Sequence, residues 1–360
     1  MPYDVKDSDL LFHFLNVGFG DNIIVEFPAK AGLRSYGLVD CYKHDKTRLY
    51  LDQLRNLRPG HNNLEFICAT HPHFDHICGI KKFIENPNYR PKQFWDSGFR
   101  HKSDTYLKIL EAINDYDVDM VRVSSGMEWV YDHVQVTALA PSIRLRNNYA
   151  TYGVDMNNAS IVLRFENHKD DYVLLQSQEY KGRSSELADR TAGQSVVILT
   201  GDAEFDSWSY IVDEFPRREK QSEHNPLVKK ILNQLSCSVL KVAHHGSMHS
   251  APLDVYEKMK PEHAIISTKQ EFSETAARGI PLKRNLFPHP TSELSLEEVG
   301  ASILTTDGCY ESSDDVEGNM RNPLCSHPGS IVVAVPRGGT PVVKKYADGY
   351  DDDPVPTNVL

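Results

Sequence analysis

The sequence predicts a mixed α/β fold in which strands dominate, and three observations lead to this prediction. The 360-residue chain opens with two apolar runs, residues 11–17 and 23–27, around a glycine-containing turn, the pattern of a β-hairpin. A strand, a helix and a strand are then readable over residues 36–70. Polar residues follow the ends of both strands, at Asp40 and His71, and this placement favours a functional site.

The individual elements follow from apolar spacing. The strand–helix–strand unit is expected as residues 36–39, 45–57 and 64–70, because Leu51 and Leu54 lie on one face of the helix. Later strands are expected at residues 134–139, 160–165, 172–176, 195–200, 238–242, 263–267, 301–305 and 330–335. Helices are expected between several of these strands.

The domain organisation is expected to be simple. No internal repeat with a period of roughly 20 to 50 residues is readable, and no Pro-, Gly- or Ser-rich linker divides the chain. We therefore expect one domain over residues 1–360. Polar segments near 166–193 and 307–327 are poor in periodic apolar residues and are expected as loop insertions.

Composition and charge restrict the class of protein. A hydrophobic fraction of 40% excludes a disordered or fibrous chain. The formal net charge of −11 means that the surface as a whole repels a polyanion, so any contact with nucleic acid must be local.

The expected location is the cytoplasm. No apolar run approaches the roughly 18 residues that a membrane span needs, so no membrane partner is expected. Residues 1–9 hold three aspartates and no cationic region before an apolar stretch, which is unlike a secretory signal. The six cysteines form no Cys-x-x-Cys pair, which disfavours a zinc knuckle or a disulfide framework.

The run His71-Pro72-His73-Phe74-Asp75-His76 carries the densest chemistry. Three imidazoles and one carboxylate fall within six residues, and Pro72 excludes a regular helix interior. A loop that presents these side chains can supply ligands to two adjacent metal ions. The alternative is a surface loop that is merely rich in histidine, which the apolar strand before it disfavours.

Two further apolar strands end in residues of the same kinds. Asp202 follows Thr200-Gly201 and could bridge two cations, although alone it could equally be a turn residue or a helix N-cap. His244 and His245 follow the strand expected at 238–242. In an extended segment adjacent side chains point in opposite directions, so we expect one histidine on a metal and the other on substrate or behind a ligand. The sequence leaves open which is which.

These motifs, taken in order, resemble the metallo-β-lactamase-fold hydrolases. The resemblance is to the branch of the ComEC competence protein and phosphorylcholine esterase, and it covers most of the chain. The matching stretches are residues 15–21, 39–40, 70–79, 157–163, 200–202, 240–250, 261–267, 285–290 and 305–308.

The resemblance implies a four-layer αββα sandwich with two divalent metal ions, zinc or manganese, at one edge of its sheets. It implies a bound hydroxide that attacks a phosphoester or carbonyl centre. The implied ligands are His71 and His73 for the first metal, Asp75 and His76 for the second, Asp202 as the bridge, and His244 or His245 as the last. Asp75, Asp202 and His245 are the implied catalytic residues, and Asp40 would orient the histidine loop from behind.

One position departs from the pattern of many relatives. Where they carry a third histidine for the first metal, this chain has Asn157-Asn158. The ComEC-like branch also has asparagine at this place. An amide oxygen is a weaker zinc ligand than imidazole, so a hard ion such as manganese could suit the first site. Asn158 and His289 are candidates for a weak ligand or a substrate contact, and His101 and His133 are rival histidines.

Three hypotheses for function remain at this point. The first is a ComEC-like phosphodiesterase or nuclease acting on a phosphodiester, DNA or RNA, with Ser247, His249, His289 or Lys283-Arg284 contacting phosphate. The second is a small-molecule esterase, lactonase or phosphodiesterase, which the net charge slightly favours. The third is a non-enzymatic interaction protein with a degenerate site, which the nearly complete ligand set disfavours.

Overall fold

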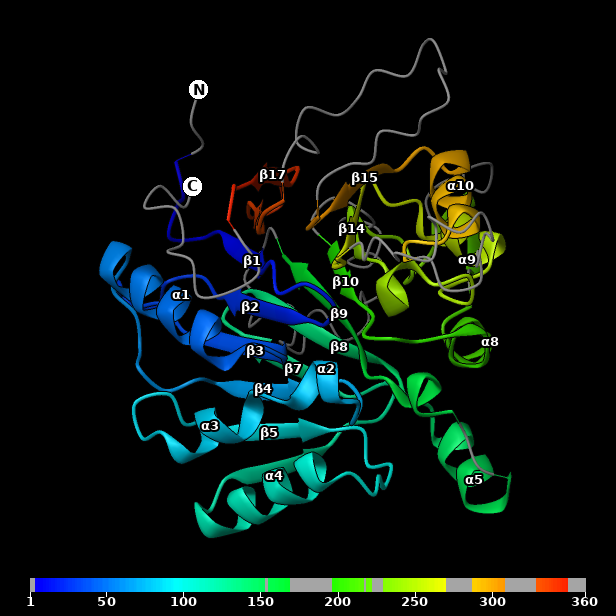
Figure 1. Cartoon of the computed structure of the whole chain (residues 1–360). Coiled ribbons are helices and arrows are strands. Elements are labelled where there is room, and N and C mark those ends of the chain that lie inside the picture. The colour runs from blue at the N-terminus through cyan, green and yellow to red at the C-terminus, as the bar shows by residue number, and fades with distance from the viewer. Residues whose placement is uncertain are drawn as a thin grey trace, which may run out of the picture.

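Two large β-sheets face each other and carry helices on their outer sides (Figure 1). The structure, a computed structural model, describes residues 4–152, 155–168, 196–216, 218–221, 229–269, 287–307 and 328–348. Within these residues the αββα sandwich that the resemblance implied is present, and the predicted fold class is confirmed.

The first sheet has eight strands in the order β17-β16-β1-β2-β3-β4-β5-β6. Its first five strands in this order pair antiparallel, and β3 to β6 pair parallel. The strands are β1 (Leu10–Phe14), β2 (Asn22–Glu26), β3 (Tyr36–Cys41), β4 (Phe66–Ala69), β5 (Gln93–Asp96), β6 (Asp119–Arg122), β16 (Ile331–Val335) and β17 (Val342–Lys345).

The second sheet has seven strands in the order β15-β14-β13-β10-β9-β8-β7. Here β10, β13, β14 and β15 pair parallel, and the remaining pairs are antiparallel. The strands are β7 (Glu128–Tyr131), β8 (Val134–Ala140), β9 (Val162–Asn167), β10 (Val196–Leu199), β13 (Val239–Lys241), β14 (His263–Ile266) and β15 (Ser302–Thr305). A separate two-stranded ribbon pairs β11 (Arg218–Gln221) with β12 (Lys229–Leu232).

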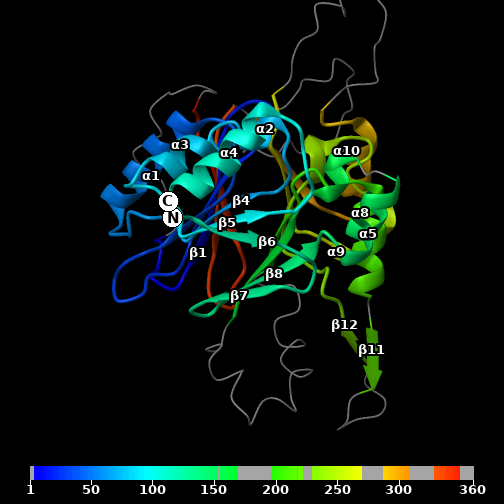
Figure 2. The same cartoon turned by 90° about the horizontal axis from the view of Figure 1, so that it is seen from below.

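The helices form the two outer layers, as Figure 2 shows most clearly. On the side of the first sheet lie α1 (His44–Leu57), α2 (Phe74–Ile77), α3 (Ile80–Glu85) and α4 (Asp104–Asp115). On the side of the second sheet lie α5 (Ile143–Tyr152), α8 (Phe205–Glu214), α9 (Leu253–Met259) and α10 (Pro290–Glu298). Two short 3₁₀ turns, η1 (Met156–Ala159) and η2 (Ala243–Gly246), precede or follow strands of the second sheet.

Three apolar clusters separate the four layers. A single strand can supply side chains to two of these clusters, because its alternate side chains point to opposite faces of the sheet, and β1 is an example. Phe12 and Phe14 join the cluster between the two sheets, together with Val136 and Leu163 from the second sheet. Leu11 joins the cluster beneath the helices of the first sheet. A third cluster lies between the second sheet and α8, α9 and α10.

The parallel strands determine where polar loops collect. Strands β3 and β4 are parallel neighbours in the first sheet, and β10 and β13 are parallel neighbours in the second. Side chains that follow the carboxyl ends of parallel neighbours lie close together at one edge of a sheet. The segments after β4, β10 and β13 hold the histidine loop, Asp202 and the His244-His245 pair.

Most expected elements are present with shifts of one to three residues at their ends. The expected helix at 45–57 is α1, and the expected strands from 134 onward correspond to β8, β9, β10, β13, β14, β15 and β16. The strand expected at 172–176 lies outside the described residues, as do residues 169–193 and 308–327 of the expected insertions. No helix among the described residues is long and apolar enough to cross a membrane.

Candidate metal centre

The histidine loop begins where β4 ends and runs into the short helix α2. His71 is buried, and its Nε2 atom lies 3.0 Å from Nδ1 of His73. His76 is fully buried on α2, where its Nε2 lies 3.8 Å from Oδ2 of Asp75. All four side chains of the loop that sequence analysis selected therefore lie within one small region.

Asp40 orients this loop from β3. Its Oδ1 accepts a hydrogen bond from the backbone N–H of Thr70 at 2.8 Å, and its Oδ2 accepts from Oγ1 of Thr70 at 2.7 Å. Nδ1 of His76 lies 2.7 Å from Oδ2 of Asp40. This contact directs the other ring nitrogen, Nε2, away from Asp40. Asp40 thus contacts both the strand end at Thr70 and the histidine loop at His76.

Asp202 follows β10 and lies at the centre of the histidines. Its backbone N–H donates to Oγ of Ser160 at 3.1 Å, which fixes the turn after the strand. Its Oδ2 atom lies 3.2 Å from Nε2 of His76, 3.7 Å from Nε2 of His71 and 3.9 Å from Nε2 of His244. Burial opposes ionisation of Asp202, but the neighbouring imidazoles outweigh it and hold its pKa well below the usual range.

The His244-His245 segment differs from the sequence prediction. It is a left-handed turn, with φ of 46° at His244 and 51° at His245, and it is not extended. Because both residues have this conformation, both rings turn toward the carboxylates. His245 Nε2 lies 3.6 Å from Oδ2 of Asp75, while its Nδ1 donates to the carbonyl of Ser267 at 2.8 Å. The expectation of opposite directions was wrong because it assumed strand geometry.

These contacts define a carboxylate–histidine cluster. It consists of His71, His73, Asp75, His76, Asp202, His244 and His245. Three of its buried atoms, His76 Nε2, His245 Nε2 and Asp202 Oδ1, have no hydrogen-bond partner of ordinary geometry within the described part of the chain. Buried polar atoms are nearly always satisfied, so their convergence fits a site built for cations. Two overlapping groups of ligand atoms, one around Asp202 and one around Asp75, are close enough to hold an ion.

The donors of the cluster differ in charge in the metal-free chain. Burial lowers the pKa of His76, but the charges of Asp202 and Asp40 outweigh it and raise this pKa well above 6.5, so a bound cation must displace the proton of His76. His71 and Asp75 instead already have the charge that cation binding needs. Burial lowers the pKa of His71, and the charge of His76 adds to this, so His71 is neutral. Burial raises the pKa of Asp75, but the hydrogen bond with His245 and the charge of His76 outweigh it and lower this pKa. Neutral imidazoles and ionised carboxylates are the forms that bind metal.

The two asparagines have separate contacts. The side-chain oxygen of Asn158 accepts a hydrogen bond from the backbone N–H of Ser207 at 3.0 Å, so it holds the start of α8. This contact argues against Asn158 as a weak ligand. Asn157 instead contacts the cluster, because its Nδ2 lies 3.4 Å from Nδ1 of His244.

The two rival histidines, His133 and His101, lie at different places relative to the cluster. His133 lies in the turn just before β8. It contacts Asp132 and the carbonyl of Ser8. It is not part of the cluster. The ring of His101 lies 5.9 Å from that of His73, beside the cluster.

The predicted phosphate contacts are only partly described. His289 caps α10 through its Nδ1, which accepts from the backbone N–H of Thr291 at 3.2 Å, and its own N–H donates to the carbonyl of Gly246. Ser247 is buried, whereas His249 is exposed and packs edge-on against Phe205. Lys283 and Arg284 lie outside the described residues.

Sequence reasoning gave no role to two acidic residues that contact the cluster, Glu204 and Asp21, or to Lys241, which pairs with Asp21. Glu204, two residues after Asp202, lies 2.7 Å from Nδ1 of His244. Asp21 and Lys241 form a buried ion pair at 2.7 Å, and Asp21 Oδ2 is 4.0 Å from Nδ1 of His76. The only signal in the sequence is that Asp21 and Lys241 lie within matching stretches and that Glu204 lies two residues beyond one.

Two aromatic rings flank the paired histidines. The Phe287 ring lies 5.6 Å from His244 and 6.4 Å from His245, and the Phe19 ring lies 6.3 Å from His245. Phe19 and Phe287 also contact each other edge to face, at 6.0 Å. Apolar rings at these positions shield one side of the cluster from water, which strengthens the electrostatic interactions inside it.

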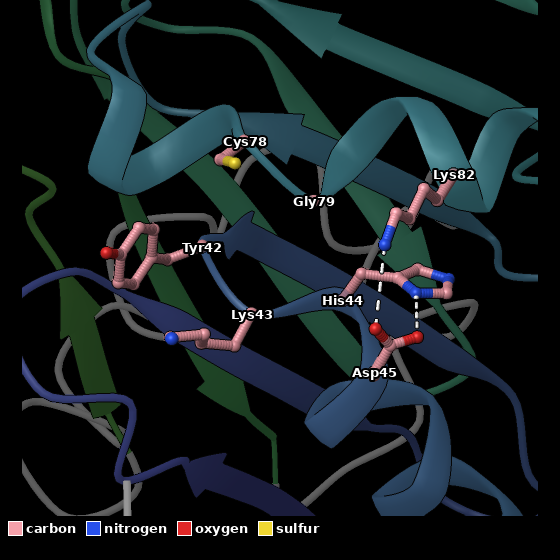
Figure 3. Close-up of a pocket in the computed structure, with 7 residues that line it drawn as sticks. All are labelled: Tyr42, Lys43, His44, Asp45, Cys78, Gly79 and Lys82. Carbon is pink, nitrogen blue, oxygen red and sulfur yellow. Dashed lines mark hydrogen bonds and ion pairs between the residues drawn. The ribbon is translucent and has the colours of Figure 1, made fainter. Parts of the chain in front are cut away.

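A pocket of about 240 Å³ lies beside the histidine loop, where α1 begins and α2 ends (Figure 3). Lys43, His44 and Lys82 contribute basic side chains to its lining, and Asp45 contributes an acid. Asp45 contacts both Lys82, at 3.5 Å, and Nδ1 of His44, at 2.8 Å. No member of the carboxylate–histidine cluster lines this pocket, so it adjoins the centre and does not contain it.

Comparisons with known proteins add little to this description. No protein-family model matches the chain, and no curated protein matches its sequence. It is similar to the solved structure of CmlA, a diiron β-hydroxylase from Streptomyces venezuelae, at 9% identity and a TM-score of 0.39, over 84% of this chain and 53% of that one. The chain thus spans about half of the hydroxylase. A diphosphatase from the PhnP family matches at 14% identity and a TM-score of 0.32, over 73% of this chain and 78% of its own. Likenesses at these TM-scores carry no argument about the reaction.

Proposed function

We propose that the chain is a metal-dependent hydrolase of the metallo-β-lactamase-fold class with a dinuclear centre of zinc or manganese. The observation that carries this proposal is the position of Asp202. Its buried carboxylate faces three imidazole Nε2 atoms within 3.9 Å, and a second carboxylate, Asp75, lies 3.8 Å and 3.6 Å from two imidazoles. Mixed imidazole and carboxylate donors suit both ions.

The ligand roles that the sequence resemblance implies, together with the contacts in the cluster, support an assignment of ligands to two positions. Position one would be held by His71, His73 and Asp202, and position two by Asp75, His76, His245 and Asp202. Among the described residues, Asp202 is the one carboxylate within 4.0 Å of imidazoles from both groups, so it would be shared.

When bound, two divalent ions would activate water at neutral pH and neutralise the charge that gathers on the oxygens of a reacting phosphoester. The protein's own residues prepare this chemistry. Asp40 and the Ser267 carbonyl hold Nδ1 of His76 and of His245, so that each Nε2 faces the carboxylates. Asp75 has 39% of its side chain exposed, so it can also orient a water or a substrate at the open side of the cluster.

We infer a phosphodiester as the substrate, with DNA or RNA as the polymer form. The ComEC-like motifs support this inference, and so do the basic side chains of Lys43 and Lys82 beside the histidine loop. A small-molecule esterase, lactonase or phosphodiesterase is the second candidate, because a net charge of −11 opposes binding of a polyanion.

The test combines metal content with hydrolysis of a phosphodiester dye, bis(p-nitrophenyl) phosphate. Elemental analysis should find up to two zinc or manganese ions per chain. Exhaustive chelation should abolish dye hydrolysis, and either metal should restore it. A metal-free preparation that still hydrolyses the dye would sink the proposal, and a chain that binds two ions but hydrolyses no ester would indicate the non-enzymatic alternative.

A further inference from the structure

His244 has a contact on each side of its ring. Its Nδ1 lies 2.7 Å from Oε1 of Glu204, and its Nε2 lies 3.9 Å from Oδ2 of Asp202. The ring is mostly buried, with 23% of the side chain exposed, and Glu204 is 15% exposed. Asn157 Nδ2 donates to the same oxygen of Glu204 at 3.2 Å. Glu204 is therefore held in place by Asn157 while it contacts the imidazole.

The two proposed metal positions differ in how many donors they have. Position two has four protein donors, whereas position one has only three, from His71, His73 and Asp202. Structural zinc sites use four protein ligands and catalytic sites three plus a water, and one of the three donors of position one, Asp202, is shared with position two. Asn158 stands where many relatives carry a histidine, and its side-chain oxygen accepts a hydrogen bond from the backbone N–H of Ser207. Position one therefore lacks a donor from η1.

The contact with Glu204 makes the Nε2 of His244 available. Glu204 is a carboxylate and accepts a hydrogen bond, so it fixes the proton of a neutral imidazole on Nδ1 and leaves a lone pair on Nε2. That atom lies 3.9 Å from Oδ2 of Asp202, the oxygen shared by the two positions, which is also 3.7 Å from Nε2 of His71 and 3.2 Å from Nε2 of His76. His76 and His245 already give position two its imidazoles, so the open place for a further imidazole on this oxygen is beside His71. The left-handed conformation of His244 and His245 lets both rings face carboxylates from adjacent positions in the chain.

We propose that His244 is the fourth protein ligand of position one and that Glu204 is its positioning residue. Together they replace the histidine that is missing at Asn157-Asn158. The paired histidines then serve different metals, His244 position one and His245 position two. This inference rests on the proposed dinuclear centre.

The experiment compares metal binding by the full-length chain and its variants after chelation. Titration with zinc and elemental analysis count the bound ions, and the visible absorption of the cobalt-substituted protein reports the number of nitrogen donors. The variants are His244→Ala, His244→Asn, Glu204→Gln and Asn157→Ala. Asparagine tolerates the left-handed conformation, so His244→Asn still tests the loss if the alanine variant does not fold. His61→Ala and Glu257→Gln, both at exposed positions, are the matched controls.

We expect the wild type and both controls to bind two ions with the same cobalt spectrum. Both His244 variants should keep one tight ion and bind the other at least ten-fold more weakly, with a changed cobalt spectrum. Glu204→Gln should weaken the same ion by about 10- to 100-fold, the range typical of residues that orient a ligand. Asn157→Ala should weaken it less than His244→Ala does.

The outcomes separate this inference from the proposed function. If the wild type binds no second ion, the dinuclear proposal fails and this inference fails with it. If the wild type binds two ions and the His244 variants bind both with unchanged affinity and spectrum, only this inference is overturned, and His244 contacts substrate instead. Loss of the ion in Asn157→Ala but not in His244→Ala would also overturn it, in favour of an amide ligand.

Discussion

Asp75 is the residue whose replacement should separate catalysis from folding. Its carboxylate is partly exposed and contacts His76 and His245, not the apolar core. We expect Asp75→Ala and Asp75→Asn to lose one bound ion and to lower kcat/KM on the dye by roughly 10² to 10⁴-fold or more. The free energy of unfolding of the metal-free chain should change by less than about 1 kcal/mol, because the side chain is near the surface.

Metal content, dye hydrolysis and urea unfolding of the chelated protein check this prediction. Asp206→Asn is the matched control, since Asp206 is exposed in the first turn of α8 and contacts no histidine of the cluster. Full activity with unaltered metal content in Asp75→Asn would remove Asp75 from the mechanism.

Individual site residues could be predicted from sequence where the ligands lie in one short run. The spacing from His71 to His76 already indicates a loop of donors, and the structure brings these side chains together. The contact between Glu204 and His244 could not be predicted, because it depends on the parallel pairing of β10 with β13, which places the ends of two distant strands side by side. Sequence spacing carries no information about that register.

At the scale of elements, the left-handed turn at His244 to Gly246 should be sensitive to a single methyl group. Gly246 has φ of 77°, and a Cβ there would lie 2.8 Å from Cβ of Pro288. Gly300 has φ of 82°, but a Cβ there meets nothing within 4 Å. Both alanine variants pay the cost of a left-handed residue, about 1 to 2 kcal/mol, but only Gly246→Ala must also displace Pro288.

We therefore expect Gly246→Ala to weaken metal binding and to destabilise the chain more than Gly300→Ala, which should bind metal like the wild type. Titration with zinc and thermal unfolding measure the two effects. Equal loss of stability together with wild-type metal affinity in both variants would contradict the role of this turn.

The junction between β2 and α1 should make stability depend on pH. Glu26 is fully buried and accepts from Nε of Arg58 at 2.7 Å, with Nε of Arg34 at 3.1 Å and Nε2 of His13 at 3.1 Å. Burial raises the pKa of Glu26, but the hydrogen bonds from His13 and Arg58 outweigh it and lower the pKa from 4.5 to about 2. Stability from this group is therefore present above pH 4.5 and is lost as the pH falls toward 2.

The expected loss over that interval is on the order of 3 kcal/mol. Burial also lowers the pKa of His13, so acid destabilises the folded chain through His13 in the same direction. Urea unfolding at several pH values, with chelator present, measures this slope. Glu26→Gln should be less stable at pH 7 and show a flatter pH dependence, with exposed Glu257→Gln as the control. Parallel curves for Glu26→Gln and the wild type would contradict the argument.

Elements could be predicted from sequence where both faces of a strand are buried. Strands β1, β2 and β10 are buried along their whole length, and their continuous apolar runs are readable. Strands β6 and β7 lie at sheet edges with alternating or mostly exposed side chains, so no apolar run marks them in the sequence. Edge strands are recognised by their partners, which a single sequence does not reveal.

At the scale of the whole molecule, negative charge must be overcome locally if a polyanion is the substrate. Lys81 and Lys82 allow a matched test, because they are adjacent on α3 and only Lys82 lines the pocket beside the histidine loop. Lys82 pairs with Asp45 of the same pocket at 3.5 Å, and Lys81 pairs with Glu85 at 2.5 Å on its own helix. We expect Lys82→Gln to raise KM for DNA several-fold and Lys81→Gln to leave it unchanged, with neither changing dye hydrolysis. Equal effects of both variants would assign the loss to net charge alone.

The substrate itself should be decided by salt dependence. A chain of net charge −11 can hold DNA or RNA only through a local basic groove and the bound cations, so binding must release counterions from the few phosphates contacted. If about four phosphates are neutralised, affinity should fall roughly 100-fold between 50 and 200 mM salt, whereas the singly charged dye should be hydrolysed at nearly the same rate. Cleavage of linear DNA, RNA and the dye, measured side by side with manganese and with zinc, checks this expectation. If the dye is hydrolysed but neither polymer is cut at low salt with any metal, the nuclease proposal is wrong and the small-molecule hydrolase takes its place, with the fold and the metal centre unaffected.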